Sequence, residues 1–448
     1  MSLRIQNGRL IDPSQRIDSV QNILIADGKV RWIGLGTPEA DQIIDAGGKV
    51  VCPGFLDMHA HEDPCDPAQP PDEARDNLAC LLRMGVTTAL AGNCGDNFGD
   101  PVAFLERAEK QGCYVNVAML AGYTFYREQF SAAGPYRPAA AAETEKIRAA
   151  LAAALEHGCC GISFGLEYVP GTSAEEIAMA AELCAGRKKL LAAHIRGCAE
   201  AACAAAQEVL EAGRIASVPV QLSHIGSMAA YGQMAQLLQL VDAYRAAGVD
   251  ASCDCYPYTA FCTYIGSAPY DDLDAMHCRY EDIELCEGRY KGQRCTKEIF
   301  EQERREHPDY LTVGHVMLEE EIRMAYRHPH VMVGSDCFLS RGEGHPRAAG
   351  AFPRFLSRYT GDGTLSLYEA IERITARPAE KLGLSGKGTL RVGADADLVI
   401  FDPARFRDRA SFSEPTLPPE GLDLVLLGGE IAVREGRIVN GRLGRPIR

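Results

Sequence analysis

Two histidines separated by one residue are the clearest chemical signal in the sequence. His59 and His61 lie in the segment PGFLDMHAH, where an apolar run typical of a β-strand ends. Residues i and i+2 project from the same face of a strand, so both imidazoles can reach one metal ion. A lone histidine is usually structural, but two in this register, after a Pro-Gly pair and an aspartate, predict a metal site.

Later apolar segments each end in one further candidate group. Cys94 lies in AGNCGDN, His194 in LLAAHIRG, His224 in QLSHIG and Asp336 in VMVGSDC. Imidazole and thiolate together favour zinc, whereas calcium or magnesium would require oxygen ligands. Each residue alone is weak evidence. They form a site only if the elements that carry them bring their ends to one place.

Strand-like apolar segments alternate with helical ones through the middle of the chain. Helical stretches such as 143–157 and 200–212 separate the apolar runs, which indicates a βαβα pattern and a parallel sheet. With the run into Phe55 there are about eight strands, the number a (β/α)₈ barrel requires. The other predicted strands are VTTALAG, YVNVAML, CGISFGL, LLAAHI, VPVQLSHI, VDASCDCY and HVMVGSD. A doubly wound sheet would give the same alternation, but ligand-type residues at nearly every strand end favour the barrel.

The two ends of the chain have a different texture. Near the N-terminus, Asp27-Gly28 separates two apolar runs, which is typical of a β-hairpin, and short strands with turns return in the last segment. We therefore predict an α/β fold in which residues 1–53 and 385–448 form a composite β-sandwich and residues 54–384 form the barrel. The polar, charged stretch 269–308 interrupts the alternation and is predicted to be a lid or insertion.

Composition excludes several classes of partner. The chain has 448 residues and a formal net charge of −15, so no basic surface indicates nucleic acid or an anionic membrane. Neither a secretory signal nor a transmembrane span is recognisable, which predicts a cytoplasmic protein. The 17 cysteines form no C-x-x-C pair and are expected to remain free thiols. The predicted partner is a small-molecule substrate, with a homo-oligomer left open.

The ordered motifs resemble a known family. His59-Ala60-His61, the two later histidines and Asp336 are similar to the amidohydrolase superfamily, whose first, fifth, sixth and eighth strands carry such groups. The quartet Gly92-Asn93-Cys94-Gly95 resembles the N-acyl-D-amino-acid deacylases, in which a cysteine on the second strand is a metal ligand. The segments GISFGLEYVPG, DCYPYTA, HPRAAGAFPRFL and PAEKLGLSGKGTLRVGADADLVIFDP are similar to the same family.

The resemblance implies a cofactor, a reaction and roles for these residues. The reaction would be zinc-dependent hydrolysis of the amide bond in N-acyl amino acids of D configuration, on a barrel with a β-sandwich built from both termini. Asp336 would be the catalytic acid/base. The implied metal ligands are Cys94, His194 and His224 for one tightly bound zinc ion, with His59 and His61 near a second, weaker site.

Substrate contacts are predicted from arginines and tyrosines. Arg347 matches a family arginine that holds the substrate carboxylate, because a guanidinium group forms a two-pronged match to a planar anion. Further predicted contacts are Arg196, Tyr168, Tyr256 and Tyr258. Glu167 follows the fourth strand and is a weaker candidate for approaching the metals, whereas His345 and His315 are taken as structural.

Two departures from the family pattern bear on substrate range. The family usually follows its sixth-strand histidine with a second histidine and a lysine that helps hold the substrate carboxylate, but this sequence reads His224-Ile225-Gly226. The third strand runs into AGYTFYRE, where relatives more often have Gly-His-Gly. The acyl group, the side chain and the number of metals therefore stay open.

Two alternative functions remain. A cyclic amidase of the dihydropyrimidinase or hydantoinase type would need a carboxylated lysine after the fourth strand, and GISFGLEYVPG contains no lysine. A non-catalytic scaffold of amidohydrolase descent would be expected to have lost metal ligands, which this sequence keeps.

Overall fold

A parallel sheet of eight strands forms the centre of the computed structural model, which describes residues 2–63, 72–187 and 189–448. The strands pair in chain order, each with the next, as a (β/α)₈ barrel requires. Every predicted barrel strand is present, so the predicted barrel architecture is confirmed. The strands are β6 (Phe55–Asp57), β7 (Val86–Ala91), β8 (Asn116–Gly122), β9 (Gly161–Gly165), β10 (Leu190–His194), β11 (Val220–Leu222), β12 (Ala251–Cys255) and β16 (Val331–Val333).

Backbone hydrogen bonds join the first and last barrel strands at and beyond their ends. The amide of Met58 donates to the carbonyl of Val333 over 3.2 Å, and the amide of Asp336 donates to the carbonyl of His59 over 2.7 Å. The segments that carry the paired histidines and the predicted catalytic aspartate are therefore fixed against each other by the same contacts that close the barrel.

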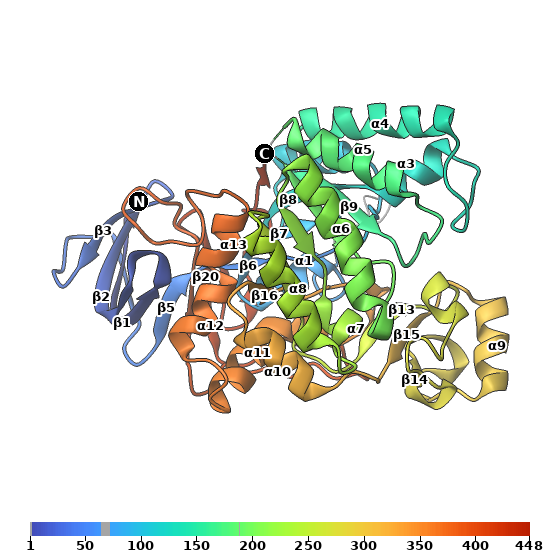
Figure 1. Ribbon diagram of the computed structural model, residues 1–448. Coiled ribbons are helices and arrows are strands. Elements are labelled where there is room, and N and C mark those ends of the chain that lie inside the picture. The colour runs from blue at the N-terminus through green and yellow to red at the C-terminus, as the bar shows by residue number, and fades with distance from the viewer. Residues whose placement is uncertain (1, 64–71, 188) are drawn as a thin grey trace.

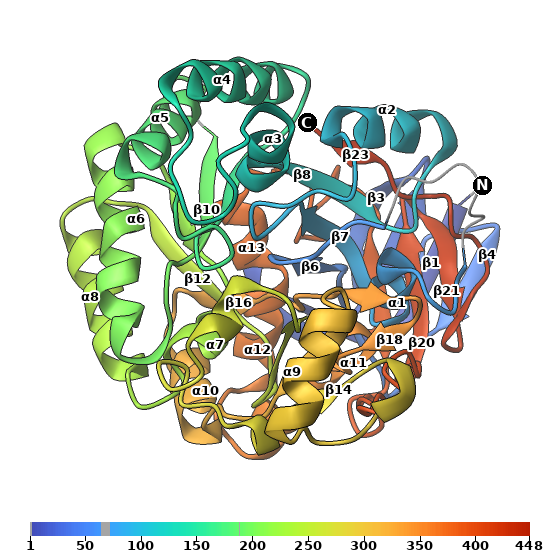
Figure 2. The same cartoon turned by 90° about the vertical axis from the view of Figure 1, so that its right-hand side faces the viewer.

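Helices surround the barrel strands. Figure 2 shows this ring, with the insertion that contains α9 (Lys297–Glu306) in front of it. Within the described residues no helix combines the length and the apolarity needed to cross a membrane. The other helices are α1 (Asn77–Arg83), α2 (Pro101–Gln111), α3 (Tyr123–Phe130), α4 (Ala141–Glu156), α5 (Ala174–Ala185), α6 (Ala202–Ala216), α7 (Ile225–Ala229), α8 (Met234–Ala246), α10 (Glu319–Arg327), α11 (Arg347–Gly361), α12 (Leu367–Ile374) and α13 (Ala376–Lys381).

A second sheet is built from both ends of the chain. Strands from the two termini meet where β5 pairs with β1 on one side and with β19 on the other, and their inward side chains share a core separate from that of the barrel. In Figure 1 this sheet lies at the opposite end of the molecule from the insertion. Its strands are β1 (Ser2–Asp12), β2 (Ile17–Ala26), β3 (Lys29–Gly34), β4 (Gln42–Asp45), β5 (Val50–Pro53), β19 (Leu398–Phe401), β20 (Leu422–Leu427), β21 (Glu430–Arg434) and β22 (Arg437–Ile438).

The stretch predicted as a lid lies within a small folded insertion between β12 and β16. Its three antiparallel strands are β13 (Phe261–Tyr264), β14 (Ile283–Leu285) and β15 (Leu311–Gly314). The insertion is tied to barrel loops by polar contacts: Tyr136 donates to Asp271 over 2.6 Å, and His277 lies 3.0 Å from Glu200.

One buried carboxylate joins the terminal sheet to the barrel. Asp397, just before β19, accepts hydrogen bonds from Asn116 of barrel strand β8 (3.0 Å), from the amide of Gly428 (2.7 Å) and from Lys387 (2.6 Å). Its side chain is 6% exposed, so removing it leaves buried donors unpaired, which is costly.

We expect Asp397→Ala to lower the free energy of unfolding by about 2–4 kcal/mol and to loosen the coupling between sheet and barrel. The chain has one tryptophan, Trp32 on β3, so its fluorescence reports the terminal sheet while far-UV circular dichroism reports mainly the barrel helices. In urea the fluorescence transition of the variant should precede the dichroism transition.

The matched control is Asp18→Ala, which removes an exposed ion pair with Arg9 in the same terminal sheet and should cost less than about 1 kcal/mol. Equal effects of the two substitutions would contradict the assigned role of Asp397.

Candidate metal centre and active site

Cys94, His194 and His224 converge at the carboxyl ends of their strands. One ligand atom from each lies within 4.8 Å of the others, and all three side chains are buried. Cys94 Sγ is 3.3 Å from His224 Nε2. These are the residues that the sequence assigns to a tightly bound metal.

A second cluster shares Cys94 with the first. It contains His59, His61 and Asp336, again with one ligand atom from each within 4.8 Å of the others. Cys94 Sγ is 3.3 Å from His59 Nε2, and Asp336 Oδ1 is 3.3 Å from His61 Nε2. The two clusters form one continuous group of donors around the thiol.

Three of these residues have a strained backbone. Cys94, His224 and Asp336 have φ angles of 55°, 30° and 50°, in the left-handed region that side-chain-bearing residues rarely adopt. Such a conformation costs about 1–3 kcal/mol per residue. Each comes soon after a barrel strand ends, where the left-handed turn directs its side chain into the mouth of the barrel.

The turn around Cys94 also needs a close backbone approach. A Cβ atom at Gly165, the last residue of β9, would lie 2.1 Å from the carbonyl oxygen of Cys94. Glu62 holds the other side, because its carboxylate accepts hydrogen bonds from the amides of Gly92 and Phe98 at 3.0 Å. The turn that presents the thiol is therefore fixed from two sides, by Glu62 after the neighbouring strand β6 and by the close approach of β9, two strands away.

Outer partners orient the histidines. Asp254 Oδ1 lies 3.2 Å from His59 Nδ1 and accepts a hydrogen bond from the amide of His224. Ser227 Oγ lies 2.9 Å from His224 Nδ1. Such partners fix the ring orientation of metal-binding histidines. Asp254 and Ser227 were missed by the sequence reasoning, although the position of Asp254 near the end of a predicted strand was an available signal.

Glu167 lies next to the first cluster. Its Oε2 atom is 2.9 Å from His194 Nε2, which is the approach to the metal site that the sequence offered as a weaker candidate. His194 Nδ1 is buried and has no hydrogen-bond partner among the described residues.

Charge compensation sets the ionisation of the thiol and the carboxylate. Burial raises the pKa of Cys94, but positive charge on His59 and His224 outweighs burial and holds that pKa well below its usual value. Burial also raises the pKa of Asp336, but Arg347, followed by His59 and His61, holds it well below its ordinary range. Asp336 is therefore anionic at neutral pH, and the surroundings of Cys94 favour its thiolate form.

The donor set fits a zinc ion. An anionic thiol and imidazole nitrogens, close together and buried, are typical zinc ligands. The unpartnered Nδ1 of His194 is a buried acceptor that a metal would satisfy. The ligands that would hold it are Cys94, His194 and His224, with His59 and His61 beside them.

Two cavities open beside the clusters. The smaller, inner one has a volume of about 20 Å³ and lies against His194, His224 and Glu167. The larger, outer one has a volume of about 440 Å³ and reaches past His61 towards solvent. They are two chambers of one site, because they share lining residues: Tyr168, Cys262, Thr263, Asp336 and Arg347.

Arg347 is mostly engaged by Asp336 but keeps one free donor. Its Nη2 is 2.8 Å from Asp336 Oδ2, and its Nε donates to the carbonyl oxygen of Asp336 over 2.8 Å. The Tyr256 ring lies 4.6 Å from the guanidinium carbon. Nη1 is buried without a hydrogen-bond partner among the described residues. The arginine can therefore position Asp336 and bind an anion at the same time.

The remaining predicted substrate contacts divide into two groups. Tyr168 lines both chambers and Tyr256 lines the inner one. Arg196 lines neither and is bonded to Glu208 and to the carbonyls of residues 170 and 172. Tyr258 also lines neither, and donates instead to a backbone carbonyl. The structure does not bring these last two to the metal ligands.

The position of the missing family lysine is closed by packing. A Cβ atom at Gly226 would lie 2.8 Å from a methyl carbon of Ile322 and 3.0 Å from the Cys255 sulfur. A lysine there would need both neighbours to move. Recognition of a substrate carboxylate therefore has to come from another group.

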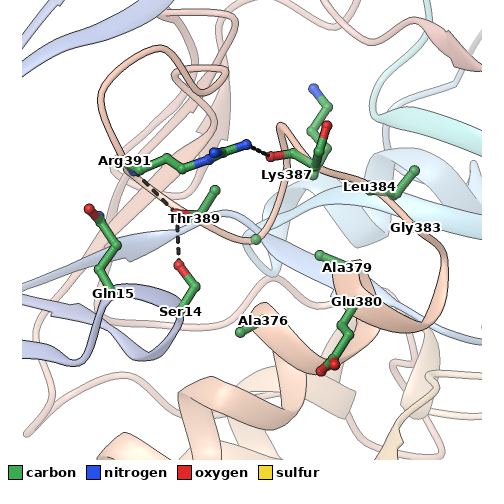
Figure 3. A pocket seen from close by; sticks show the side chains of 12 residues that line it. Ser14, Gln15, Ala376, Ala379, Glu380, Gly383, Leu384, Lys387, Thr389 and Arg391 are labelled. Atoms are coloured by element: carbon green, nitrogen blue, oxygen red, sulfur yellow. Dashed lines mark hydrogen bonds between the residues drawn. The ribbon is translucent and has the colours of Figure 1, made fainter.

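A separate cavity lies at the junction of the terminal sheet and the barrel (Figure 3). It has a volume of about 390 Å³ and is lined by residues around α13 and the turn after β1. Several of its polar side chains are already paired: Ser14 donates to Thr389 over 2.7 Å, and Arg391 donates to the carbonyl of Ser385 over 2.6 Å. None of its lining residues is a predicted site residue, and we assign it no function.

Comparison with known proteins gives matches over the whole chain. A family profile described as "Amidohydrolase family" matches residues 303–433. An N-acyl-D-glutamate deacylase of Alcaligenes xylosoxydans xylosoxydans is 33% identical over 96% of this chain and 93% of its own. A D-aminoacylase of the same organism is 29% identical over 99% and 97%.

A solved structure matches equally well. The N-acyl-D-glutamate deacylase of Bordetella bronchiseptica, complexed with zinc and a phosphonate inhibitor that mimics the tetrahedral intermediate, has a TM-score of 0.89 and 30% identity. The match covers 100% of this chain and 99% of that one.

We expect Cys94→Ser to weaken zinc binding by at least about 100-fold, because it removes the thiolate common to both clusters. Loss of a ligand should cost more affinity than the loss of an outer partner, which is typically about 10- to 100-fold. Elemental analysis of protein purified with zinc should fall from about one ion per chain to a small fraction. The matched control is Cys203→Ser, a half-buried cysteine on α6, which should retain its zinc. Full zinc content in Cys94→Ser would contradict the assignment.

Proposed function

Because the chain belongs to the N-acyl-D-amino-acid deacylase family of metal-dependent amidohydrolases, which act on linear amide bonds, we propose that it hydrolyses N-acyl-D-amino acids with the help of zinc. The products are a carboxylate and a free D-amino acid. The D configuration rests on what the relatives are named for, not on a feature of the site.

The observation that carries the proposal is the convergence of Cys94, His194 and His224 beside an ionised Asp336. When bound there, zinc supplies Lewis-acid activation of the amide carbonyl and of the attacking water. Amide hydrolysis further requires a base for the water and an acid for the departing nitrogen. We assign both tasks to Asp336.

Proton movement is assigned to Asp336 Oδ1. This atom faces His59 and His61, at 3.5 and 3.3 Å, while Oδ2 is held by Arg347. With one oxygen fixed and the other turned towards the donors, the carboxylate takes a proton from water at Oδ1. It then returns that proton to the amide nitrogen as the C–N bond breaks. Arg347 is the positioning residue for this transfer.

The substrate carboxylate is assigned to Arg347 Nη1. This donor is buried and unpartnered among the described residues, and Arg347 lines both chambers. Tyr256 presents a buried hydroxyl, also unpartnered among the described residues, on the inner chamber and can add a second hydrogen bond. A buried donor left without a partner is unfavourable, so an anion bound here is stabilised.

The cysteines support a reducing compartment. The 16 cysteines in the described part of the chain are free, which is the usual state in the cytoplasm. We place the enzyme there, acting on a small soluble substrate.

We expect Asp336→Asn to lower kcat by about 100- to 10,000-fold while zinc content stays near that of the wild type. Asparagine keeps an oxygen acceptor for Arg347 but cannot carry the proton. Steady-state hydrolysis of N-acetyl-D-amino acids with parallel zinc analysis tests this. Asp274→Asn, an exposed residue of the insertion, is the control and should be fully active. Turnover within tenfold of the wild type in Asp336→Asn would remove this residue from the mechanism.

A substrate panel separates this function from its alternatives. Zinc-loaded protein should hydrolyse N-acetyl-D-amino acids at least about 100-fold faster than the L partners, measured as kcat/KM by release of free amine. Ring opening of hydantoin or dihydrouracil without linear amide hydrolysis would indicate a cyclic amidase. If the zinc-loaded protein is inactive on every substrate, the result would favour a non-catalytic scaffold.

A further inference from the structure

The outer chamber of the site carries uncompensated negative charge. Asp96 and Glu128 line it and are exposed to solvent, and neither forms an ion pair with another described residue. Two arginines line the same chamber, but each is already matched. Arg347 is 2.8 Å from Asp336, and Arg127 lies 3.6 Å from Glu176 and donates to backbone carbonyls.

Aromatic rings form one wall of the chamber. Phe98 and Phe338 stack with ring centres 5.3 Å apart, and Tyr264 meets Phe338 edge-on at 5.4 Å. All three line the chamber and are partly exposed. An aromatic face attracts a cation and packs against the methylene stem of a long amine or guanidine side chain.

The wall begins at the metal donors. The His61 ring lies 5.8 Å from the Phe338 ring and 6.4 Å from the Phe98 ring. At the other side, Arg347 lines both chambers, and its buried Nη1 has no hydrogen-bond partner among the described residues. A substrate whose carboxylate binds Arg347 and whose amide lies at the donors therefore extends along the rings towards Asp96 and Glu128.

We propose that this chamber selects N-acyl-D-amino acids with a positive charge several bonds from the amide and disfavours those with a second carboxylate. The inference rests on the proposed function and names its substrate class. The charge can be carried by the amino-acid side chain or by the end of the acyl group, since either can occupy the chamber. Asp96 and Glu128 determine this specificity, whereas the N-acyl-D-glutamate deacylases among the relatives are named for an acidic substrate.

Two matched substrate series test the proposal by kcat/KM. In the first, N-acetyl-D-lysine, N-acetyl-D-methionine and N-acetyl-D-glutamate vary the charge on the side chain. In the second, N-(6-aminohexanoyl)-D-alanine and N-hexanoyl-D-alanine vary it on the acyl group. In the series whose variable group enters the chamber, kcat/KM for the cationic substrate should be about tenfold higher than for the neutral one. If the side chain enters, kcat/KM for N-acetyl-D-lysine should be about 100-fold higher than for N-acetyl-D-glutamate. Partly solvated charges contribute effects of this size, and salt should weaken them.

The double variant Asp96→Asn/Glu128→Gln should reduce the cationic-to-neutral ratio to near one. Glu182→Gln, an exposed acidic residue on α5, is the control and should leave the ratio unchanged. Using the ratio cancels any general loss of activity that the double variant causes.

A binding measurement provides a readout independent of turnover. By calorimetry, n-hexylammonium should bind the zinc-loaded wild type about tenfold more tightly than 1-hexanol, and the double variant should lose this difference. Equal kcat/KM values for cationic and neutral substrates in both series, or a higher kcat/KM for N-acetyl-D-glutamate than for N-acetyl-D-lysine, would overturn the inference. The deacylase function would still stand. Inactivity on every N-acyl-amino acid would overturn the proposed function and this inference with it.

Discussion

Charge compensation in a buried space is the constraint on which this site depends. The site favours the anionic forms of Cys94 and Asp336 although both are buried, and a buried charge is tolerated only when it is paired or bound to a metal. Arg347 forms an ion pair with Oδ2 of Asp336 and donates a hydrogen bond to the backbone carbonyl of Asp336. The thiolate has no such arginine and lies among imidazoles. The arrangement is therefore stable as a holder of a divalent cation rather than as an empty cluster.

Strain at the strand ends is the means by which the fold achieves this arrangement. Cys94, His224 and Asp336 all have left-handed backbones. Each turn is held by a hydrogen bond to another part of the barrel: Gly95 to Ser163, His224 to Asp254 and Asp336 to His59. The amide of Asp336 is bonded to the carbonyl of His59, which also closes the barrel. The stability of the closed sheet offsets the local cost of these conformations. Function and barrel closure thus depend on the same few hydrogen bonds.

The barrel could be predicted from the sequence because the barrel strands are buried on both faces. Such strands appear as continuous apolar runs, and a ligand-type residue at each end marks the active-site edge. Side-chain direction was harder to predict. Tyr256 and Tyr258 are two residues apart just beyond β12, but only Tyr256 lines a chamber, because the chain has left the strand and its period of two no longer applies.

The arginines show the same limit. Arg196 and Arg347 were both predicted to contact the substrate, but only Arg347 lines a chamber. Arg196 is bonded to Glu208, a pairing that its position two residues after His194 does not reveal. Asp254 was missed because a buried aspartate near a strand end can be recognised as a partner of His59 only once β6 and β12 are placed on either side of β16.

The packing around Gly226 connects the substrate anchor to the charge of the outer chamber. Residue 226 is a glycine with Ile322 and Cys255 packed against it, so this position supplies no cation to the site. Arg347 is then the cation left to bind a substrate carboxylate, and its single free donor suffices for one. A second carboxylate would meet Asp96 and Glu128 with no described cation free to pair with it. The absence of a positive charge at residue 226 and the presence of two negative charges at the mouth therefore act in the same direction on the substrates that can bind.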